Sequence, residues 1–359
     1  MSQSLSEISK AGVSVWLDDL SRARLANGSL QKLIAEDCVV GVTTNPSIFN
    51  AAISNSDLYA PDIKKFRDLD VDQIITELTC SDVSAACDLF MPIYEKTDHQ
   101  DGRISIEVDP RFARDTKSTV AQGVSLWKRI NKPNLMIKVP ATKEGLPAIT
   151  SLISQGISVN VTLIFSVNRY REVLTAYADG LKLANANGIK LNQIFSVASF
   201  FISRIDTEVD KVLPNDSSLK GAAAIANAIM AYQAFTEFSN SAQWQELVNL
   251  GANLQRPLWA STGVKDPAYD PTRYVMQLVA RNTVNTMPEA TLKAVRESGV
   301  FVGDTITGNY QNAKSTLAKL ALIGVDLEKI TDHLETDGVA KFESAWLELI
   351  DSVKTVAGR

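Results

Sequence analysis

Histidine and cysteine are scarce in this sequence. Among 359 residues the only histidines are His99 and His333, and the cysteines are Cys38, Cys80 and Cys87. Two histidines in polar surroundings do not suit a histidine-rich metal site or a Ser-His-Asp triad. The cysteine spacing fits no zinc motif, so the sequence indicates buried, reduced thiols and predicts no metal site.

Several other signatures are missing. Neither GxGxxG nor GxxxxGK[ST] occurs, and no apolar run approaches the roughly 20 residues that span a membrane. The opening segment MSQSLSEISKAG lacks the apolar core of a signal peptide, which predicts a cytoplasmic protein. A formal charge of −5 with 45% hydrophobic residues gives no indication of a nucleic-acid or membrane partner. The chemistry must therefore come from Lys, Asp, Glu, Ser, Thr, Asn and Arg.

What the sequence does contain is a regular alternation of β-rich runs and helical patterns. The β-rich runs lie at 13–19, 39–45, 103–109, 134–140, 158–165, 193–199 and 257–262, with a weaker one at 282–288. Helical patterns cover 19–36, 111–131, 143–155, 167–187 and 219–240. This alternation predicts an α/β protein with a parallel sheet, and eight such units favour a (β/α)8 TIM-type barrel.

The chain is longer than the typical barrel of about 250 residues. The extra length is expected in a helical insert at about 46–100 and a helical C-terminal extension at about 310–356. The sequence shows no low-complexity linker and no internal repeat, so we expect one domain over 1–359.

Each predicted strand has an apolar face and a second face that becomes polar toward its C-terminal end. In 103–109, for example, Ser105, Glu107 and Asp109 alternate with apolar residues. In a barrel this second face points inward, so its polar side chains would meet at the C-terminal mouth. An open sheet covered by helices on both sides would instead need two apolar faces.

Lys138 interrupts the apolar run NLMIKVPAT. A lysine that points into a barrel is desolvated, which favours the neutral amine, and a neutral amine can attack a carbonyl to form a Schiff base. The alternative is a buried structural ion pair with Glu107 or Asp18. The same mouth would also receive Asn45, Asn160, Thr162 and Ser199, and this convergence favours a functional lysine.

Most of the remaining candidates have both a functional and a structural interpretation. Asp18 and Glu107 can transfer protons, and they can also simply neutralise Lys138. By its spacing Asn45, which precedes a proline, is a helix cap. Arg204 and Lys265 can bind a phosphate at the mouth or lie on the surface.

Taken together, these segments resemble the transaldolases, in particular their longer bacterial subfamily. The matching motifs, in the family's order, are VWLDD, GVTTNPSIF, SIEVDPR, MIKVPAT, NVTLIFS, SFFISRID, WASTGVK and TDGVAKFESAW. The resemblance implies an α/β barrel without metal or organic cofactor. It also implies the transfer of a dihydroxyacetone unit from sedoheptulose 7-phosphate to glyceraldehyde 3-phosphate. The products are erythrose 4-phosphate and fructose 6-phosphate, in the non-oxidative pentose phosphate pathway.

The resemblance also implies roles for individual residues. Lys138 corresponds to the Schiff-base lysine, Asp18 to the acid/base at the C4 hydroxyl, Glu107 to a carboxylate that works through a water, and Thr162 to the residue that holds this water. The remaining correspondences are Asn45, Asn160 and Ser199 to donor hydroxyl contacts and Arg204 to a phosphate ligand. Many members carry an arginine just after the serine that corresponds to Ser261, where this chain has Thr262-Gly263. Lys265 is therefore our candidate for the second phosphate cation, and Ser261 is a candidate hydrogen-bond donor.

Two alternatives stay open. One is a related class I aldolase that releases free dihydroxyacetone, and the other is a non-catalytic barrel that binds sugar phosphates. The oligomeric state does not follow from the sequence.

Overall fold

The strands of this computed structural model, which describes residues 3–55 and 57–358, form a closed barrel. Within those residues eight strands pair in chain order, every pair is parallel, and β8 closes onto β1. The strands are β1 (Val13–Leu17), β2 (Val39–Val42), β3 (Arg103–Glu107), β4 (Leu135–Pro140), β5 (Val159–Ile164), β6 (Ser196–Phe201), β7 (Gln255–Ala260) and β8 (Thr283–Met287). The predicted TIM-type barrel is confirmed.

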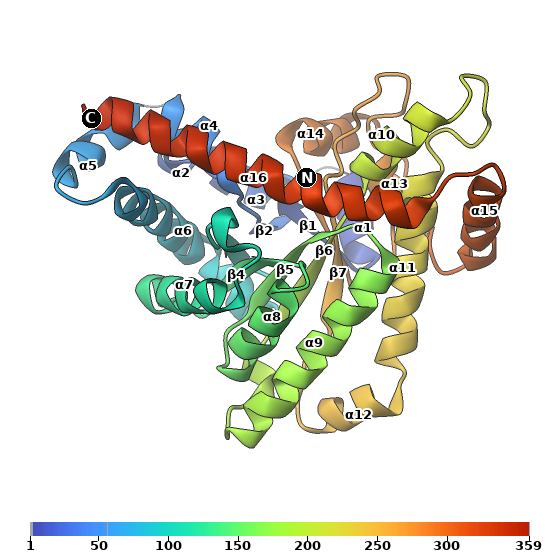
Figure 1. Cartoon of the computed structure of the whole chain (residues 1–359), viewed down its shortest axis with the longest axis horizontal. Helices are drawn as coiled ribbons and strands as arrows, with labels where there is room; N and C mark the ends of the chain where they lie inside the picture. The colour runs from blue at the N-terminus through green and yellow to red at the C-terminus, as the bar shows by residue number, and fades with distance from the viewer. Residues whose placement is uncertain (1–2, 56, 359) are drawn as a thin grey trace.

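Helices surround the barrel (Figure 1). They are α1 (Gln3–Lys10), α2 (Arg22–Ala26), α3 (Ser29–Glu36), α4 (Pro46–Ser54), α5 (Ala60–Lys65), α6 (Val71–Lys96), α7 (Thr116–Ile130), α8 (Gly145–Ser154), α9 (Val167–Ala186), α10 (Ser203–Val212), α11 (Ala223–Ser239), α12 (Ala242–Asn249), α13 (Arg273–Met276), α14 (Glu289–Ser298), α15 (Tyr310–Leu322) and α16 (Leu327–Ala357). Short 3-10 turns occur at Asp57–Tyr59, Pro110–Phe112 and Leu191–Gln193.

The helix expected over 19–36 is two helices in the structure. α2 begins after Ser21, whose side chain accepts a hydrogen bond from the Arg24 amide. Gly28 then adopts a left-handed conformation with φ of +79° and precedes α3. Glycine reaches this conformation without the steric cost that other residues meet, which explains why the helical pattern is interrupted there.

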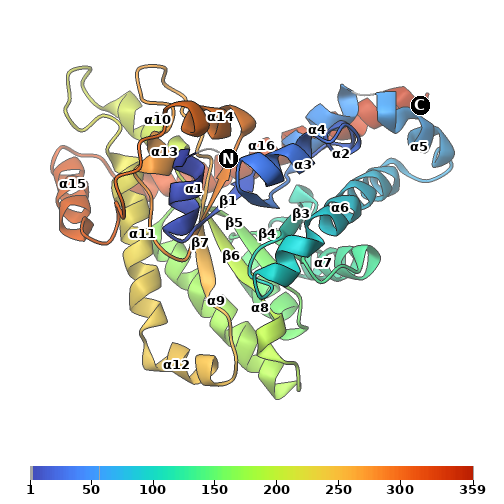
Figure 2. The same cartoon turned by 180° about the vertical axis from the view of Figure 1, so that it is seen from behind.

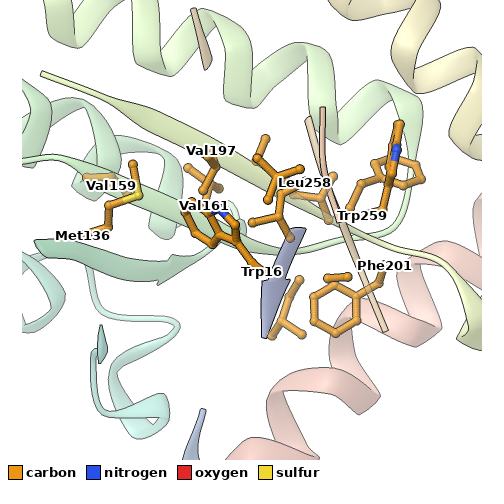
Figure 3. Packing of buried hydrophobic residues seen from close by; sticks show 14 of the residues in the cluster. Trp16, Met136, Val159, Val161, Val197, Phe201, Leu258 and Trp259 are labelled. Carbon is orange, nitrogen blue, oxygen red and sulfur yellow. The ribbon is translucent and has the colours of Figure 1, made fainter. Parts of the chain in front are cut away.

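The interior of the barrel is filled by side chains. Figure 3 shows part of this packing, with Trp16, Met136, Val197 and Leu258 contributed by four different strands. Trp16 is fully buried, and a Cβ atom at position 41 would lie 2.5 Å from its indole. Gly41 on β2 therefore leaves the space that the large ring on β1 occupies.

Helices outside the repeating units cover two sides of the barrel. α4, α5 and α6 occupy the segment between β2 and β3, and α15 packs beside α11 in both views (Figures 1 and 2). The long helix α16, red in Figure 1, runs across the C-terminal ends of the strands and contacts α4, α10 and β5. In the described part of the chain no helix is both long enough and apolar enough to cross a membrane.

Candidate active site

Lys138 lies in the middle of β4 and points into the barrel. The parallel register places it beside Glu107 on β3 and Asn160 on β5. Its Nζ atom is 3.2 Å from Glu107 Oε2 and donates a hydrogen bond of 3.0 Å to the Thr44 carbonyl. Only 4% of the residue is exposed, so the amine is withdrawn from bulk water while Lys138 still borders a cavity.

Two carboxylates flank this lysine. Burial raises the pKa of Glu107 to about 7, although the positive charge of Lys138 opposes the increase. The pKa of Asp18 is also raised, again mainly by desolvation, against the charge of Lys138 and a hydrogen bond of 2.6 Å donated by Thr43. Both groups therefore hold a proton at higher pH than free carboxylates do, which suits groups that exchange protons near neutrality.

A cavity of about 210 Å3 opens at the C-terminal mouth beside Lys138. Its walls include most of the side chains that the sequence predicted for the site. Those residues are Asp18, Asn45, Lys138, Thr162, Ser199, Arg204, Ser261 and Lys265. The predicted convergence at this end of the barrel is therefore present in the structure.

Glu107 and Asn160 do not line this cavity but support its floor. Asn160 accepts a hydrogen bond of 2.7 Å from the Ser199 hydroxyl and donates one of 2.9 Å to the Ser105 hydroxyl. These two hydrogen bonds connect residues on β3, β5 and β6 and fix the orientation of the Asn160 amide. Glu107 contacts Lys138 and faces a second, very small cavity of about 20 Å3, room for a single water molecule.

Thr162 carries a hydroxyl that makes no hydrogen bond to any residue the structure describes. Its Oγ1 atom is buried, and the residue lines the cavity. A buried hydroxyl without a partner loses free energy unless water or a ligand satisfies it. The position is chemically suited to hold a water molecule or a substrate hydroxyl.

Asn45 has the structural role that its spacing predicted. Its Oδ1 atom accepts a hydrogen bond of 3.0 Å from the Ile48 amide and caps α4, and Pro46 occupies the first helical position. The residue also borders the cavity. Because the cap uses only the oxygen, the amide nitrogen of this residue stays available as a donor within the described part of the chain.

Two cations border the cavity from neighbouring segments. Arg204, on α10, packs over the Phe201 ring at 5.2 Å, and its buried Nη1 atom has no hydrogen-bond partner within the described chain. Burial lowers its pKa, while the charges of Asp337 and Asp18 oppose this change. Lys265, in the loop after β7, is exposed at the rim. An unsatisfied guanidinium beside a second cation is suited to bind a phosphate.

The structure adds residues that the sequence analysis did not assign. The Thr43 hydroxyl donates a hydrogen bond to Asp18 and lies 2.7 Å from the Thr286 hydroxyl, so it links these two residues. Phe342, on α16, lines the cavity with its ring centroid 5.6 Å from Lys138 Nζ. Thr43 was visible on the polar face of its predicted strand, and Phe342 lies within the motif TDGVAKFESAW, although nothing in that motif placed it beside the barrel.

Comparisons with known proteins agree with this geometry. A family model described as Transaldolase/Fructose-6-phosphate aldolase matches residues 15–353. Transaldolase 1 of Streptomyces avermitilis is 52% identical over 360 residues, which cover 98% of this chain and 95% of that protein. The transaldolase of Mycolicibacterium smegmatis is 53% identical over 357 residues, which cover 98% of this chain and 96% of that protein. The transaldolase of Mycobacterium tuberculosis strain H37Rv is 52% identical over 358 residues, which cover 98% of this chain and 96% of that protein.

Proposed function

This chain belongs to the transaldolase/fructose-6-phosphate aldolase family and functions as a transaldolase, and we propose that Lys138 is the nucleophile of its reaction. The observation that carries this assignment is the contact of 3.2 Å between buried Lys138 and Glu107. A carboxylate at this distance can take the proton that the amine must lose before it attacks a ketone. Asp18 and Lys138 both line the cavity at the C-terminal mouth of the barrel.

The proposed reaction transfers a dihydroxyacetone unit from sedoheptulose 7-phosphate to glyceraldehyde 3-phosphate. The Lys138 amine adds to C2 of the ketose, and the carbinolamine loses water as protons pass through Glu107 and a water held by Thr162. Asp18 then removes the proton of the C4 hydroxyl, and the C3–C4 bond breaks with the iminium as electron sink. Erythrose 4-phosphate leaves, and the enamine adds to the second aldehyde to give fructose 6-phosphate.

Several further assignments belong to this proposal. Asn45, Ser199 and Ser261 would contact the substrate hydroxyls, while Arg204 and Lys265 would hold its phosphate. The substrate contact that the sequence predicted for Asn160 does not fit its place below the cavity, so Asn160 would act by orienting Ser199. The iminium accepts the electron pair, so the proposed steps use no metal or organic cofactor. These substrates place the reaction in the non-oxidative pentose phosphate pathway, which supports a cytoplasmic location.

Reductive trapping tests the nucleophile. Borohydride reduction in the presence of fructose 6-phosphate should attach the three-carbon unit to Lys138, as peptide mass mapping would show. Lys138→Ala should form no adduct, and Lys138→Arg should also fail because a guanidinium stays protonated. Asp18→Asn should still form a trapped adduct, while turnover falls by about 10²–10⁴, as expected when a general acid/base is removed. An adduct on another lysine, or turnover without any adduct, would refute the assignment.

The related-aldolase alternative differs in its product. An enzyme of that type would release free dihydroxyacetone from fructose 6-phosphate at a rate that does not depend on an acceptor aldehyde. A transaldolase should instead need erythrose 4-phosphate for sustained turnover. Measuring both products with and without the acceptor separates the two activities, and a protein that neither traps nor turns over would match the non-catalytic alternative.

A further inference from the structure

The segment that joins β7 to α13, residues 261–272, is attached to one face of α10. At the start of α10 the Ser203 hydroxyl lies 3.0 Å from the Ser261 hydroxyl, and the Ser203 amide donates a hydrogen bond of 3.0 Å to the Ser261 carbonyl. Further along α10, Asp210 accepts a hydrogen bond of 2.6 Å from the Tyr269 hydroxyl. Positions 203 and 210 share one face of the helix because they are seven residues apart.

Lys265 lies midway between these two points of attachment, four residues after Ser261 and four before Tyr269. It is exposed and lines both the cavity beside Lys138 and a second cavity of about 310 Å3, which Asp210 and Tyr269 also line. Its side chain makes no hydrogen bond or ion pair with any residue that the structure describes. The amine is therefore available to a ligand, and its position depends on how the segment is held.

The Tyr269 hydroxyl is the side-chain group that attaches the outer part of this segment to another element. Within the described residues 265–269 one other side chain forms a hydrogen bond, and it stays inside the turn: the Asp266 carboxylate accepts from the Ala268 amide at 2.9 Å. The Tyr269 amide donates to the Asp266 carbonyl at 3.1 Å and closes the same turn. Fixing Tyr269 therefore also fixes the residue next to Lys265.

The contact between Tyr269 and Asp210 is itself held in place. The second oxygen of Asp210 accepts a hydrogen bond of 2.9 Å from the Gly221 amide. The Arg273 guanidinium packs over the Tyr269 ring at 4.3 Å and donates to the Gly221 carbonyl. A Cβ atom at position 221 would lie 2.8 Å from the ring, so glycine leaves the space that the tyrosine occupies.

We propose that Asp210 and Tyr269 are positioning residues that hold Lys265 at the rim to bind the substrate phosphate, an inference that rests on the proposed function. Arg204, the other proposed phosphate cation, follows Ser203 on the same helix. α10 thus carries the guanidinium directly and holds the ammonium through the attached segment, which fixes the spacing of the two cations. Ordering Lys265 before the substrate arrives reduces the entropy lost on binding.

Selectivity for a phosphorylated donor measures this role, with erythrose 4-phosphate as the acceptor. Tyr269→Phe removes only the hydroxyl that reaches Asp210. It should raise the KM for fructose 6-phosphate by about threefold to tenfold, as expected when one flexible side chain must be ordered on binding. The kcat should stay within about twofold, and kcat/KM for unphosphorylated fructose should not change. Asp210→Asn keeps an oxygen that can accept from Tyr269 and should remain near the wild type, whereas Asp210→Ala should resemble Tyr269→Phe.

A double variant separates positioning of Lys265 from a general loosening of the protein. When Lys265→Ala has already removed the amine, adding Tyr269→Phe should not lower the ratio of kcat/KM for fructose 6-phosphate to kcat/KM for fructose any further. Tyr177→Phe is the matched control. Tyr177 is buried on α9, its hydroxyl donates a hydrogen bond of 2.9 Å to the Asn253 carbonyl, and it does not line the cavity at the mouth. This control should lose stability and keep the ratio.

Three results would overturn the inference while borohydride still traps Lys138 and the proposed nucleophile stands. They are an unchanged ratio in both Tyr269→Phe and Asp210→Ala, an equal loss in Tyr177→Phe, and a further loss when Tyr269→Phe is added to Lys265→Ala. An unchanged ratio in Lys265→Ala would remove the second phosphate cation and the inference with it. Loss of trapping in the wild type would instead overturn the proposed function.

Discussion

At the scale of single residues, Lys138 and Glu107 show how strand register brings a buried amine and a buried carboxyl into contact. They are direct neighbours on β3 and β4, so their side chains emerge on the same face at the same height. Burial disfavours the charge on each, and their proximity partly offsets that cost. Such a pair is well placed to exchange a proton, and this exchange is what the chemistry of a Schiff-base enzyme requires.

The raised pKa of Glu107 predicts a pH-dependent stability. In the unfolded chain the carboxyl ionises near its ordinary pKa of 4.5, whereas in the folded protein its pKa is about 7. The folded state therefore binds more protons between these values, and stability falls as the pH rises through this interval. Glu107→Gln removes the titration, so the variant should gain roughly 3 kcal/mol relative to the wild type between pH 4 and pH 8. Urea unfolding across this range measures the difference, and parallel profiles would contradict the prediction.

Arg204 predicts selectivity for phosphorylated substrates. Hydrogen bonds to charged groups contribute about 1.5–3 kcal/mol each, and about 1.4 kcal/mol corresponds to a factor of ten. Arg204→Ala should therefore lower kcat/KM for fructose 6-phosphate by one to several powers of ten and affect unphosphorylated fructose little. The kcat/KM of Arg204→Lys for fructose 6-phosphate should lie between those of the wild type and Arg204→Ala, because an ammonium does not reproduce the paired hydrogen bonds of a guanidinium.

Lys265→Ala, measured in the same way, tests the second cation at the rim. If Arg204→Ala leaves the ratio of kcat/KM for fructose 6-phosphate to kcat/KM for fructose unchanged, the phosphate is bound elsewhere. A change in that ratio for Lys265→Ala would assign the second contact to the exposed lysine.

At the scale of elements, α4 illustrates a helix end that serves both the fold and the site. Asn45 caps this helix through its oxygen while the residue borders the cavity. One residue therefore connects the stability of an inserted helix with the wall of the cavity.

Two substitutions separate these roles of Asn45. Asn45→Ala removes the cap and should cost about 1 kcal/mol of stability. Asn45→Ser retains an oxygen that can accept from the Ile48 amide, so stability should return toward the wild type, whereas the lost amide donor should still raise KM. Urea unfolding and initial rates measure the two effects. If both the stability and the KM of Asn45→Ser return to the wild-type values, Asn45 acts only through the helix.

At the scale of the whole molecule, the two ends of the barrel carry different polar networks. The C-terminal end holds the cavity, whereas the N-terminal end holds Arg256, which forms an ion pair of 2.9 Å with Asp101. Asp101 also accepts a hydrogen bond of 2.8 Å from Ser14. Nearby Arg103 is completely buried between the Phe195 and Tyr94 rings, and this burial lowers its pKa to about 9. In barrels of this kind the N-terminal face typically contributes to stability.

Asp101→Asn should therefore reduce stability without altering catalysis. Arg256 is buried whereas Asp101 is partly exposed, so the loss should approach the lower end of the roughly 3–5 kcal/mol that follows when a buried charge loses its partner. The unfolding midpoint in urea should fall, while kcat/KM at a temperature where the variant is folded should stay within about twofold of the wild type. A large loss of activity in the folded variant would show that the two ends are coupled.

The sequence by itself determined the barrel, the direction of its strands and the end of the barrel at which the candidate side chains converge. These features depend on period-two alternation within each strand and on the repeat of strand and helix, and both are local properties of the chain. Lys138, Asp18 and Thr162 could be placed at one mouth because parallel strands bring their C-terminal ends together. The motifs that resemble the transaldolase family then specified a chemistry that spacing alone left open.

Only the tertiary structure decided how these residues are divided between the cavity and its supports. Asn160 and Glu107 share the inward face with Lys138. Asn160 nevertheless orients Ser199 through a hydrogen bond, and Glu107 faces a separate small cavity. The position of Phe342 depends on how a distant helix packs across the mouth, with Gly338 permitting the approach. Such contacts between segments far apart in the chain follow from the shapes that meet, and no periodicity within either segment encodes them.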